Sequence, residues 1–340
     1  MDRRLFFRGS AQLLTGVGIA EKLRAQAGTS RTFQRVSRLF AGRAGERRSL
    51  ADVVIANNLV ISLHRNGSGS ARSFMDMKVS AARPDGTQLW EYPLPAGVYV
   101  SLGVTPDGSS VFVQALAWYP SSGTVGSNVI LRLNPANGDV TALDWANDAP
   151  RGERMHFVGG SHLVRISANA AEVWTIDGRL TPKVTAAIDV PPPFHVDCVG
   201  QSVLAITSIF GTRMSAVTLT SAEVQNFEIS SPILAQSRSI VQEMRQRNPP
   251  PGGRQAHIGS LPVTGGDKAR GLVYGLVVPS GDDRGYPIIT ISTSGIVSSL
   301  GFFDLALGTT MKGGPFRLLP ADAELGVAAS DGTVGWLAVF

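Results

Sequence analysis

The chain has 340 residues, of which 43% are hydrophobic and 17% are charged, and it contains a single cysteine. This composition excludes a disordered chain, a collagen-like chain and a small disulfide-stapled domain. Its 38 glycines and 20 prolines favour many short strands joined by tight turns. No apolar run reaches the roughly 18 to 20 residues that a helix needs to cross a bilayer, so we expect no transmembrane span.

The positive charge is concentrated at the N-terminus. Residues 1–50 carry eleven basic and three acidic side chains, whereas the remaining 290 residues carry 20 basic and 23 acidic side chains. A slightly acidic body offers no continuous positive surface to a phosphate backbone. We therefore expect no nucleic-acid partner.

The first 27 residues have the features of an export signal. Residues 2–8 (DRRLFFR) resemble the twin-arginine (Tat) motif; a mildly apolar stretch follows, and residues 25–27 (AQA) form a small-x-small cleavage site. An amphipathic helix or an organellar presequence are the alternatives. The Tat interpretation implies that the protein folds in the bacterial cytoplasm and is exported to the periplasm. Cys198 has no second cysteine to pair with, so no internal disulfide is expected.

Residues 28–50 form a second basic segment. Phe33, Val36, Leu39 and Phe40 recur at helical spacing with arginines between them, which predicts a short amphipathic arm. We expect this arm to pack on the body as a tether. Peripheral contact with anionic lipid or docking to an acidic partner are the alternatives.

From residue 51 the pattern changes to alternating strands separated by turn dipeptides. Residues 157–167 (FVGGSHLVRIS) also align with residues 198–208 (CVGQSVLAITS) at an offset of 41 residues, which indicates an internal repeat. The first two sets of predicted strands cover residues 51–56, 59–64, 75–81 and 87–92, and then residues 98–105, 110–117, 128–134 and 139–143.

The spacing of the outermost predicted strands indicates a β-propeller. A spacing near 40 to 45 residues is typical of four-stranded blades, which must stack radially to cover their faces. We predict an all-β propeller of six blades, or seven if residues 28–50 or 302–319 complete another. One longer step predicts an insertion at about 231–255 whose first half is helical. The outer strands are expected to start near Thr87, Asp139, Arg179, Glu223, Ile296 and Thr333.

Three segments carry a family resemblance. Residues 104–113 (VTPDGSSVFV), 128–134 (NVILRLN) and 137–140 (NGDV) resemble one repeat of the YVTN-type and quinoprotein-amine-dehydrogenase-like propellers. Residues 86–92 (GTQLWEY) are similar to the Gly-x-x-x-Trp signature of pyrroloquinoline-quinone-type repeats. The resemblance implies blade geometry rather than an activity. Because quinone-holding members use adjacent cysteines and Cys198 stands alone, we do not expect a quinone.

The inner strand of each blade lines a central channel, and ligands of propellers bind at its mouth. In the repeat alignment His156 is equivalent to Asp197, and Arg154 to His195. A metal such as zinc, copper or iron would suit the three histidines. Alternatively, the histidines are hydrogen-bonded packing residues at strand starts. The candidate ligand-binding residues are Arg154, His156, His195, Asp197 and His257, of which His156, His195 and His257 are the candidate metal ligands.

Catalytic motifs are missing from the sequence, which has no Gly-x-Ser-x-Gly elbow, P-loop or HExxH motif. The leading hypothesis is an exported, non-catalytic propeller that acts as a binding or scaffold subunit of a larger periplasmic assembly. Its protein partners would dock on the 231–255 insertion or the 28–50 arm. The alternative is a periplasmic enzyme or electron-transfer protein with a metal or small ligand at the channel mouth.

Overall fold

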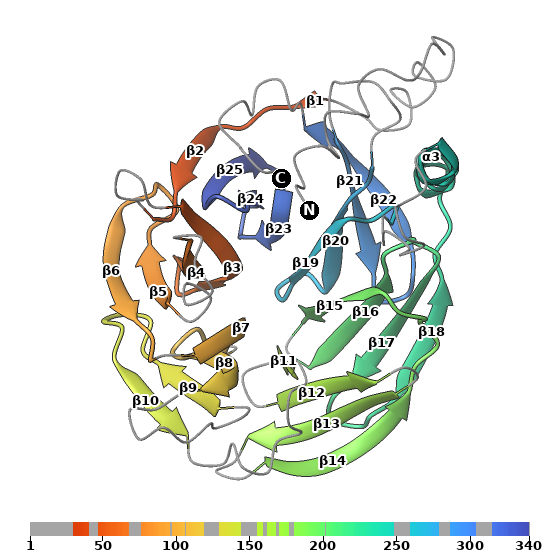
Figure 1. Cartoon of the computed structure of the whole chain (residues 1–340). Helices are drawn as coiled ribbons and strands as arrows, with labels where there is room; N and C mark the ends of the chain where they lie inside the picture. Colours follow the sequence, from red (N-terminus) through yellow and green to blue (C-terminus); the bar gives the residue numbers. More distant parts are fainter. Residues whose placement is uncertain are drawn as a thin grey trace.

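The fold is a ring of six sheets around a common axis (Figure 1). In each sheet the four main strands pair antiparallel. This result confirms the predicted all-β propeller with four-stranded blades and sets the number of blades at six. The computed structural model describes residues 30–40, 47–67, 76–95, 97–105, 107–118, 129–143, 155–158, 162–167, 170–176, 180–200, 202–247, 259–278, 286–303 and 315–339.

The first three blades follow one another along the chain, each with its innermost strand first. Blade 1 contains β3 (Arg47–Ala56), β4 (Leu59–Gly67), β5 (Met77–Ala82) and β6 (Gln88–Pro93). Blade 2 contains β7 (Gly97–Val104), β8 (Val111–Trp118), β9 (Val129–Leu133) and β10 (Val140–Leu143). Blade 3 contains β11 (Met155–Val158), β12 (His162–Ser167), β13 (Ala170–Ile176) and β14 (Leu180–Ala187).

The last three blades include both ends of the described chain. Blade 4 contains β15 (Phe194–Val199), β16 (Val203–Ser208), β17 (Arg213–Thr218) and β18 (Val224–Glu228). Blade 5 contains β19 (Val263–Asp267), β20 (Leu272–Leu276), β21 (Tyr286–Ser292), β22 (Val297–Phe303) and a short fifth strand, β1 (Ser30–Arg31). Blade 6 contains β23 (Pro315–Pro320), β24 (Glu324–Ala329), β25 (Thr333–Ala338) and β2 (Arg35–Arg38).

The N-terminal segment closes the ring. β2 pairs antiparallel with β25, while β1 pairs parallel with β22, so one short segment joins the outer edges of blades 5 and 6 (Figure 1). Leu39 and Phe40, which follow β2, are buried. Arg35–Arg38 therefore contributes the outer strand of blade 6 and does not add a seventh blade.

Two expectations about this region were wrong. In the described part of residues 28–50, which is residues 30–40 and 47–50, the chain forms strands and not the predicted helical arm. Pairing with β2 satisfies the backbone groups at the open edge of β25, which a helix would leave unpaired. The outer strand expected to start at Thr333 is instead the third strand of blade 6. The first residues of the segment, 28 and 29, lie outside the described ranges.

Turn residues and inter-blade contacts explain the repeat pattern. Asn57 and Asn58 both adopt positive φ in the two-residue turn between β3 and β4. Gly138, with a φ of 80°, lies against the indole ring of Trp90 in blade 1. Trp90 Nε1 donates a hydrogen bond of 2.9 Å to the carbonyl oxygen of Pro135 in blade 2. The tryptophan of the Gly-x-x-x-Trp segment thus packs one blade on the next.

The hydrophobic core is divided among the blade interfaces. Between blades 1 and 2, for example, Ile61, Leu63 and Val79 pack with Val113 and Leu131. Because each blade buries its faces only against its neighbours, the stability of one blade depends on the presence of the next.

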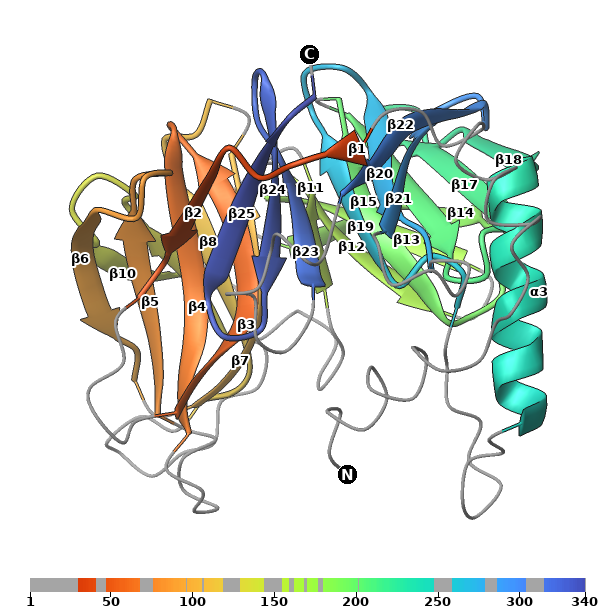
Figure 2. The same ribbon diagram turned by 90° about the horizontal axis from the view of Figure 1, so that it is seen from above.

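The helix α3 (Pro232–Arg247) connects blades 4 and 5 and stands on the outside of the ring (Figure 2). Ser231 caps it, since its Oγ accepts a hydrogen bond of 3.2 Å from Leu234 N. Ile233, Leu234 and Val241 are buried. The predicted helical half of the insertion is confirmed, and residues 248–255 lie outside the described ranges. Within those ranges, no helix has the length and hydropathy of a membrane span.

Candidate ligand site at the channel mouth

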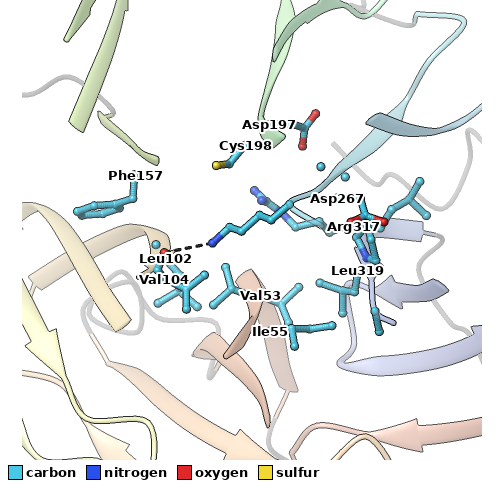
Figure 3. A pocket seen from close by; sticks show the side chains of 18 of the residues that line it. Val53, Ile55, Leu102, Val104, Phe157, Asp197, Cys198, Asp267, Arg317 and Leu319 are labelled. Carbon is cyan, nitrogen blue, oxygen red and sulfur yellow. Dashed lines mark hydrogen bonds between the residues drawn. The ribbon is translucent and has the colours of Figure 1, made fainter. Parts of the chain in front are cut away.

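A cavity of about 280 Å³ lies at one mouth of the central channel (Figure 3). It is on the face where the inner strands turn into the second strands, so all six blades contribute to it. Its charged and other chemically distinctive lining residues are Asp52, Asn58, His156, Asp197, Cys198, Asp267, Lys268, Arg270, Arg317 and Asp322.

Asp52 connects three blades at this mouth. Its side chain is 1% exposed, and Oδ1 lies 2.9 Å from Arg317 Nη2 on β23. Oδ2 accepts a hydrogen bond of 2.8 Å from Leu102 N on β7. A carboxylate this deeply buried needs such partners because burial removes its hydration. The contacts tie blade 1 to blades 2 and 6 on opposite sides.

Asp267 forms an ion pair with Arg270, as Asp52 does with Arg317. Its Oδ1 accepts hydrogen bonds from the backbone N of Ala269 and Arg270, at 2.9 and 3.0 Å. Its Oδ2 lies 3.0 Å from Arg270 Nη1. Arg270 also donates to the carbonyl oxygen of Asp322. The pair fixes the turn between β19 and β20 at the rim of the cavity.

Asp197 and His195 lie two residues apart on the same side of β15. Asp197 is 7% exposed, and its Oδ2 accepts a hydrogen bond of 2.6 Å from Thr264 Oγ1. Burial raises the pKa of the Asp197 carboxyl, although Thr264 and His195 oppose this shift. Burial lowers the pKa of His195, whose Nε2 lies 2.8 Å from the carbonyl oxygen of Leu261. A neutral His195 that donates from Nε2 satisfies this geometry.

Lys268 reaches across the channel. Its Nζ donates a hydrogen bond of 3.1 Å to the carbonyl oxygen of Val104, the bond drawn dashed in Figure 3. Lys268 follows β19 in blade 5, and Val104 ends β7 in blade 2, so the side chain spans opposite blades of the six-bladed ring. Burial lowers the pKa of its ammonium group.

Two glycines keep the inner strands close enough to form this mouth. A Cβ on Gly265 would lie 2.3 Å from the carbonyl oxygen of Leu318 in blade 6, and a Cβ on Gly266 would lie 2.2 Å from that of Cys198 in blade 4. Only glycine permits such close backbone approach. β19 is therefore held between β15 and β23 without side chains at these two points.

The predicted site residues divide into three groups. His156 and Asp197 line the cavity, as expected for inner-strand residues. His195 is outside the lining and bonds to Leu261 O. Arg154 and His257 lie outside the described ranges, so the three-histidine metal site stays a prediction. Among the described side chains, no group of three or more His, Cys, Asp and Glu residues is placed to hold a metal ion.

Asp52, Lys268 and Arg317 were missed by the sequence analysis. For Asp52 the sequence did contain an indication, because a lone carboxylate within an apolar inner strand needs a charged or hydrogen-bonding partner when it is buried. For Lys268 it contained none, since an isolated cation near a turn is ordinary on a protein surface. Arg317 lies within β23, a strand whose bounds the sequence analysis did not predict. The convergence of these three residues depends on ring closure.

Comparisons with known proteins support the fold. Neither family models nor curated proteins match the sequence. A structural genomics protein of unknown function from Bacteroides thetaiotaomicron has a TM-score of 0.50 and 12% identity over 92% of this chain and 75% of that one. The β-propeller domain of Cps50 (Swd1) from Myceliophteria thermophila has a TM-score of 0.50 and 8% identity, with coverages of 91% and 100%. At such identities the similarity is to the propeller fold alone.

Proposed function

We propose that this protein is an exported, non-catalytic propeller that binds a protein partner as a subunit of a larger periplasmic assembly. One observation carries this proposal: α3 is built onto the outside of a closed ring with a polar face directed away from it. Pro232, Ala235, Ser239, Gln242, Glu243 and Gln246 on this helix are exposed.

Side-chain contacts attach α3 to the turn between β16 and β17, which favours a docking role. Arg238 Nη1 donates a hydrogen bond of 2.9 Å to the carbonyl oxygen of Gly211, and the guanidinium of Arg245 lies 5.1 Å from the ring centre of Phe210. A preorganised surface loses little conformational entropy when a partner binds.

The channel mouth also favours binding over catalysis. Asp52 and Asp267 are engaged by arginines, and the Asp197 carboxylate accepts a hydrogen bond from Thr264. General acid–base catalysis needs titratable groups free to exchange protons with a substrate. These three carboxylates instead hold the blades and the β19–β20 turn in place.

Export through the Tat route is part of the proposal. The first described strand, β1, begins at Ser30, three residues after the predicted cleavage site at Ala27. Cleavage there would leave both closing strands, β1 and β2, in the mature chain. The Arg3→Lys/Arg4→Lys double variant should accumulate in the cytoplasm, whereas wild type should be recovered from the periplasm; equal periplasmic recovery would contradict this route.

The resemblance to YVTN-type repeats also stays within the proposal. Its segments fall in β7 to β10 or the connections between them, so they belong to a single blade. A repeat that specifies one blade is consistent with a binding scaffold, because it carries no catalytic residue of its own.

Partner capture tests the docking surface. Affinity capture of tagged full-length protein from its native periplasm should recover a stoichiometric partner, and the Ala235→Arg/Ser239→Arg variant should lose it because both residues lie on the exposed face of α3. The matched control is Ile296→Arg, which changes a 67% exposed residue at the rim of blade 5. Unchanged capture by the α3 variant would contradict docking on this helix.

Elemental analysis tests the enzyme or electron-transfer alternative. Protein purified from the native periplasm should contain less than one equivalent of any transition metal under our proposal. A tightly held equivalent that disappears in His156→Ala or His195→Ala would overturn it and restore the predicted metal site.

A further inference from the structure

The ammonium group of Lys268 differs from the other cations of the cavity. Arg317 pairs with Asp52 at 2.9 Å, and Arg270 pairs with Asp267 at 3.0 Å. In the described part of the chain, no carboxylate lies within 4 Å of Lys268 Nζ, whose hydrogen-bond acceptor there is a backbone carbonyl. The cavity thus offers one ammonium group without a counterion from these residues.

Lys268 is partly buried, which makes its ammonium group a favourable site for an anion. A charge that is partly removed from water and has no opposite charge beside it is energetically costly, so a bound carboxylate would offset a penalty that the fold already carries. The ammonium group has three N–H donors, and the contact with Val104 uses one of them. Two donors stay available for the oxygens of a ligand.

One wall of the cavity is aliphatic, and the Lys268 ammonium group reaches this wall at the carbonyl oxygen of Val104. Val53 and Ile55 on β3, Leu102 and Val104 on β7, and Leu319 on β23 line it, and Figure 3 shows their side chains gathered on one side. Asp197 and Cys198 lie on the other side. A ligand with a charged head and an apolar body would therefore match both the ammonium group and the wall.

The charge and the size of the cavity narrow the ligand class. Asp52, Asp197, Asp267 and Asp322 line the cavity, and their carboxylates disfavour a second negative charge nearby. Phosphate and sulfate dianions are thus poorer ligands than a monoanion. The volume of about 280 Å³ lies just below the range of roughly 300 to 1,000 Å³ for pockets that take drug-sized ligands, so the ligand should be small.

We propose that the channel mouth binds a small aliphatic monocarboxylate, with its carboxylate on Lys268 and its hydrocarbon body on the wall formed by Val53, Ile55 and Leu319. This site does not depend on the docking role of α3. Either proposal can fail without the other, because the cavity faces the axis of the ring and α3 stands outside it.

The test uses the purified full-length chain and butyrate as the probe, with butan-1-ol, butylammonium and sulfate as neutral, cationic and dianionic comparators. Ligand-observed NMR titration should give butyrate a dissociation constant at least about tenfold lower than that of any comparator. Butyrate that binds no better than butan-1-ol, or that does not bind at tens of millimolar, would overturn the proposal.

Two matched variants locate the charge. Lys268→Met keeps the length of the side chain but removes the ammonium group, and it should weaken butyrate binding at least about tenfold. Arg213→Met removes a surface cation that pairs with Asp189 outside the cavity, and it should change the dissociation constant by less than about threefold. Equal effects of the two variants would contradict a specific role for Lys268. Should Lys268→Met not fold, the wild-type comparison of butyrate with butan-1-ol still decides.

Discussion

The indole Nε1 of Trp336 donates a hydrogen bond of 3.2 Å to Oγ of Ser37, a residue 299 positions earlier in the chain. The bond joins the third and outer strands of blade 6. Backbone hydrogen bonds extend the pairing on both sides, from Gln34 N to Trp336 O and from Leu39 N to Gly332 O. Ring closure is therefore a contact between the two ends of the chain, and it can be tested separately from the blades.

Phe40 should contribute strongly to this closure. It is 4% exposed, and its ring stacks on His64 with centroids 4.3 Å apart. Phe40→Ala should lower the free energy of unfolding by about 3 to 5 kcal/mol, because the cavity left behind loses both burial and contacts. The control is Val36→Ala in the same segment, where a 43% exposed side chain should cost about 0.5 kcal/mol or less. Urea denaturation measures the free energy of unfolding of both variants. Equal losses of stability in the two would show that the segment does not close the ring as described.

Asp52 should matter more than an exposed ion pair. Asp52→Asn removes the negative charge that faces Arg317 in a buried site, and it should cost about 2 to 3 kcal/mol. The control is Asp189→Asn on the surface, where both side chains of the Asp189–Arg213 pair are largely exposed and the cost should stay below about 1 kcal/mol. The denaturant midpoints of the two variants are compared. If Asp189→Asn loses as much stability as Asp52→Asn, the role of Asp52 in bridging the blades is refuted.

His64 should make the protein less stable in acid. Burial is the main cause that lowers its pKa from 6.5 to about 4, with Arg48 and Lys78 adding to the effect and Glu91 opposing it. Within the described structure, no hydrogen-bond partner reaches its buried Nδ1, so a protonated ring would bury an unsatisfied N–H. Between pH 4 and 6.5 the unfolded chain binds the proton more tightly, and stability must therefore fall as the pH falls through this window.

The size of this effect follows from the shift of the pKa. The difference between a His64 pKa of 6.5 in the unfolded chain and about 4 in the folded protein corresponds to about 3 kcal/mol of stability, which is present at pH 7 and lost by about pH 4. In His64→Gln, the dependence of the unfolding free energy on pH between 4 and 6.5 should become correspondingly weaker. If wild type and variant lose stability in parallel over this range, other groups cause the loss and the prediction fails.

The two glycines of β19 should tolerate no side chain. Gly265→Ala or Gly266→Ala would place a Cβ within 2.3 Å of a backbone oxygen of a neighbouring blade, which cannot move without shifting an inner strand. We expect each to cost more than about 3 kcal/mol. Gly271→Ala is the control: its φ of 66° causes strain, but no atom lies within 4 Å of the added Cβ, so about 1 kcal/mol is expected. Thermal melting of the three variants should rank them in this order; a Gly266→Ala protein as stable as Gly271→Ala would show that the channel mouth can widen.

The strands and turns of the middle blades were predictable because their causes are local. Alternating apolar residues select a strand, and turn residues such as Gly138 end it, whatever the rest of the chain does. The alignment of residues 157–167 with residues 198–208 succeeded for the same reason, because β12 and β16 occupy equivalent places in consecutive blades. The helical half of the insertion was also predicted from the spacing of its apolar residues.

The N-terminal segment and the site could not be predicted in this way. Phe33, Val36, Leu39 and Phe40 have helical spacing, but Arg35–Arg38 forms a strand, because the unpaired edge of β25, some 300 residues away, offers it backbone partners. Asp52 and Arg317 meet for a similar reason. A local sequence pattern cannot predict a pairing between residues that meet only after the ring has closed.

By itself, the sequence determined the class of the fold, the approximate length of each blade and the position of α3, since these depend on interactions between residues close together in the chain. The tertiary structure decided that there are six blades, that Arg35–Arg38 supplies the outer strand of the last one, and that Lys268 spans the channel toward Val104. These features depend on closing one ring around one axis, which brings distant residues together through the packing of all six blades.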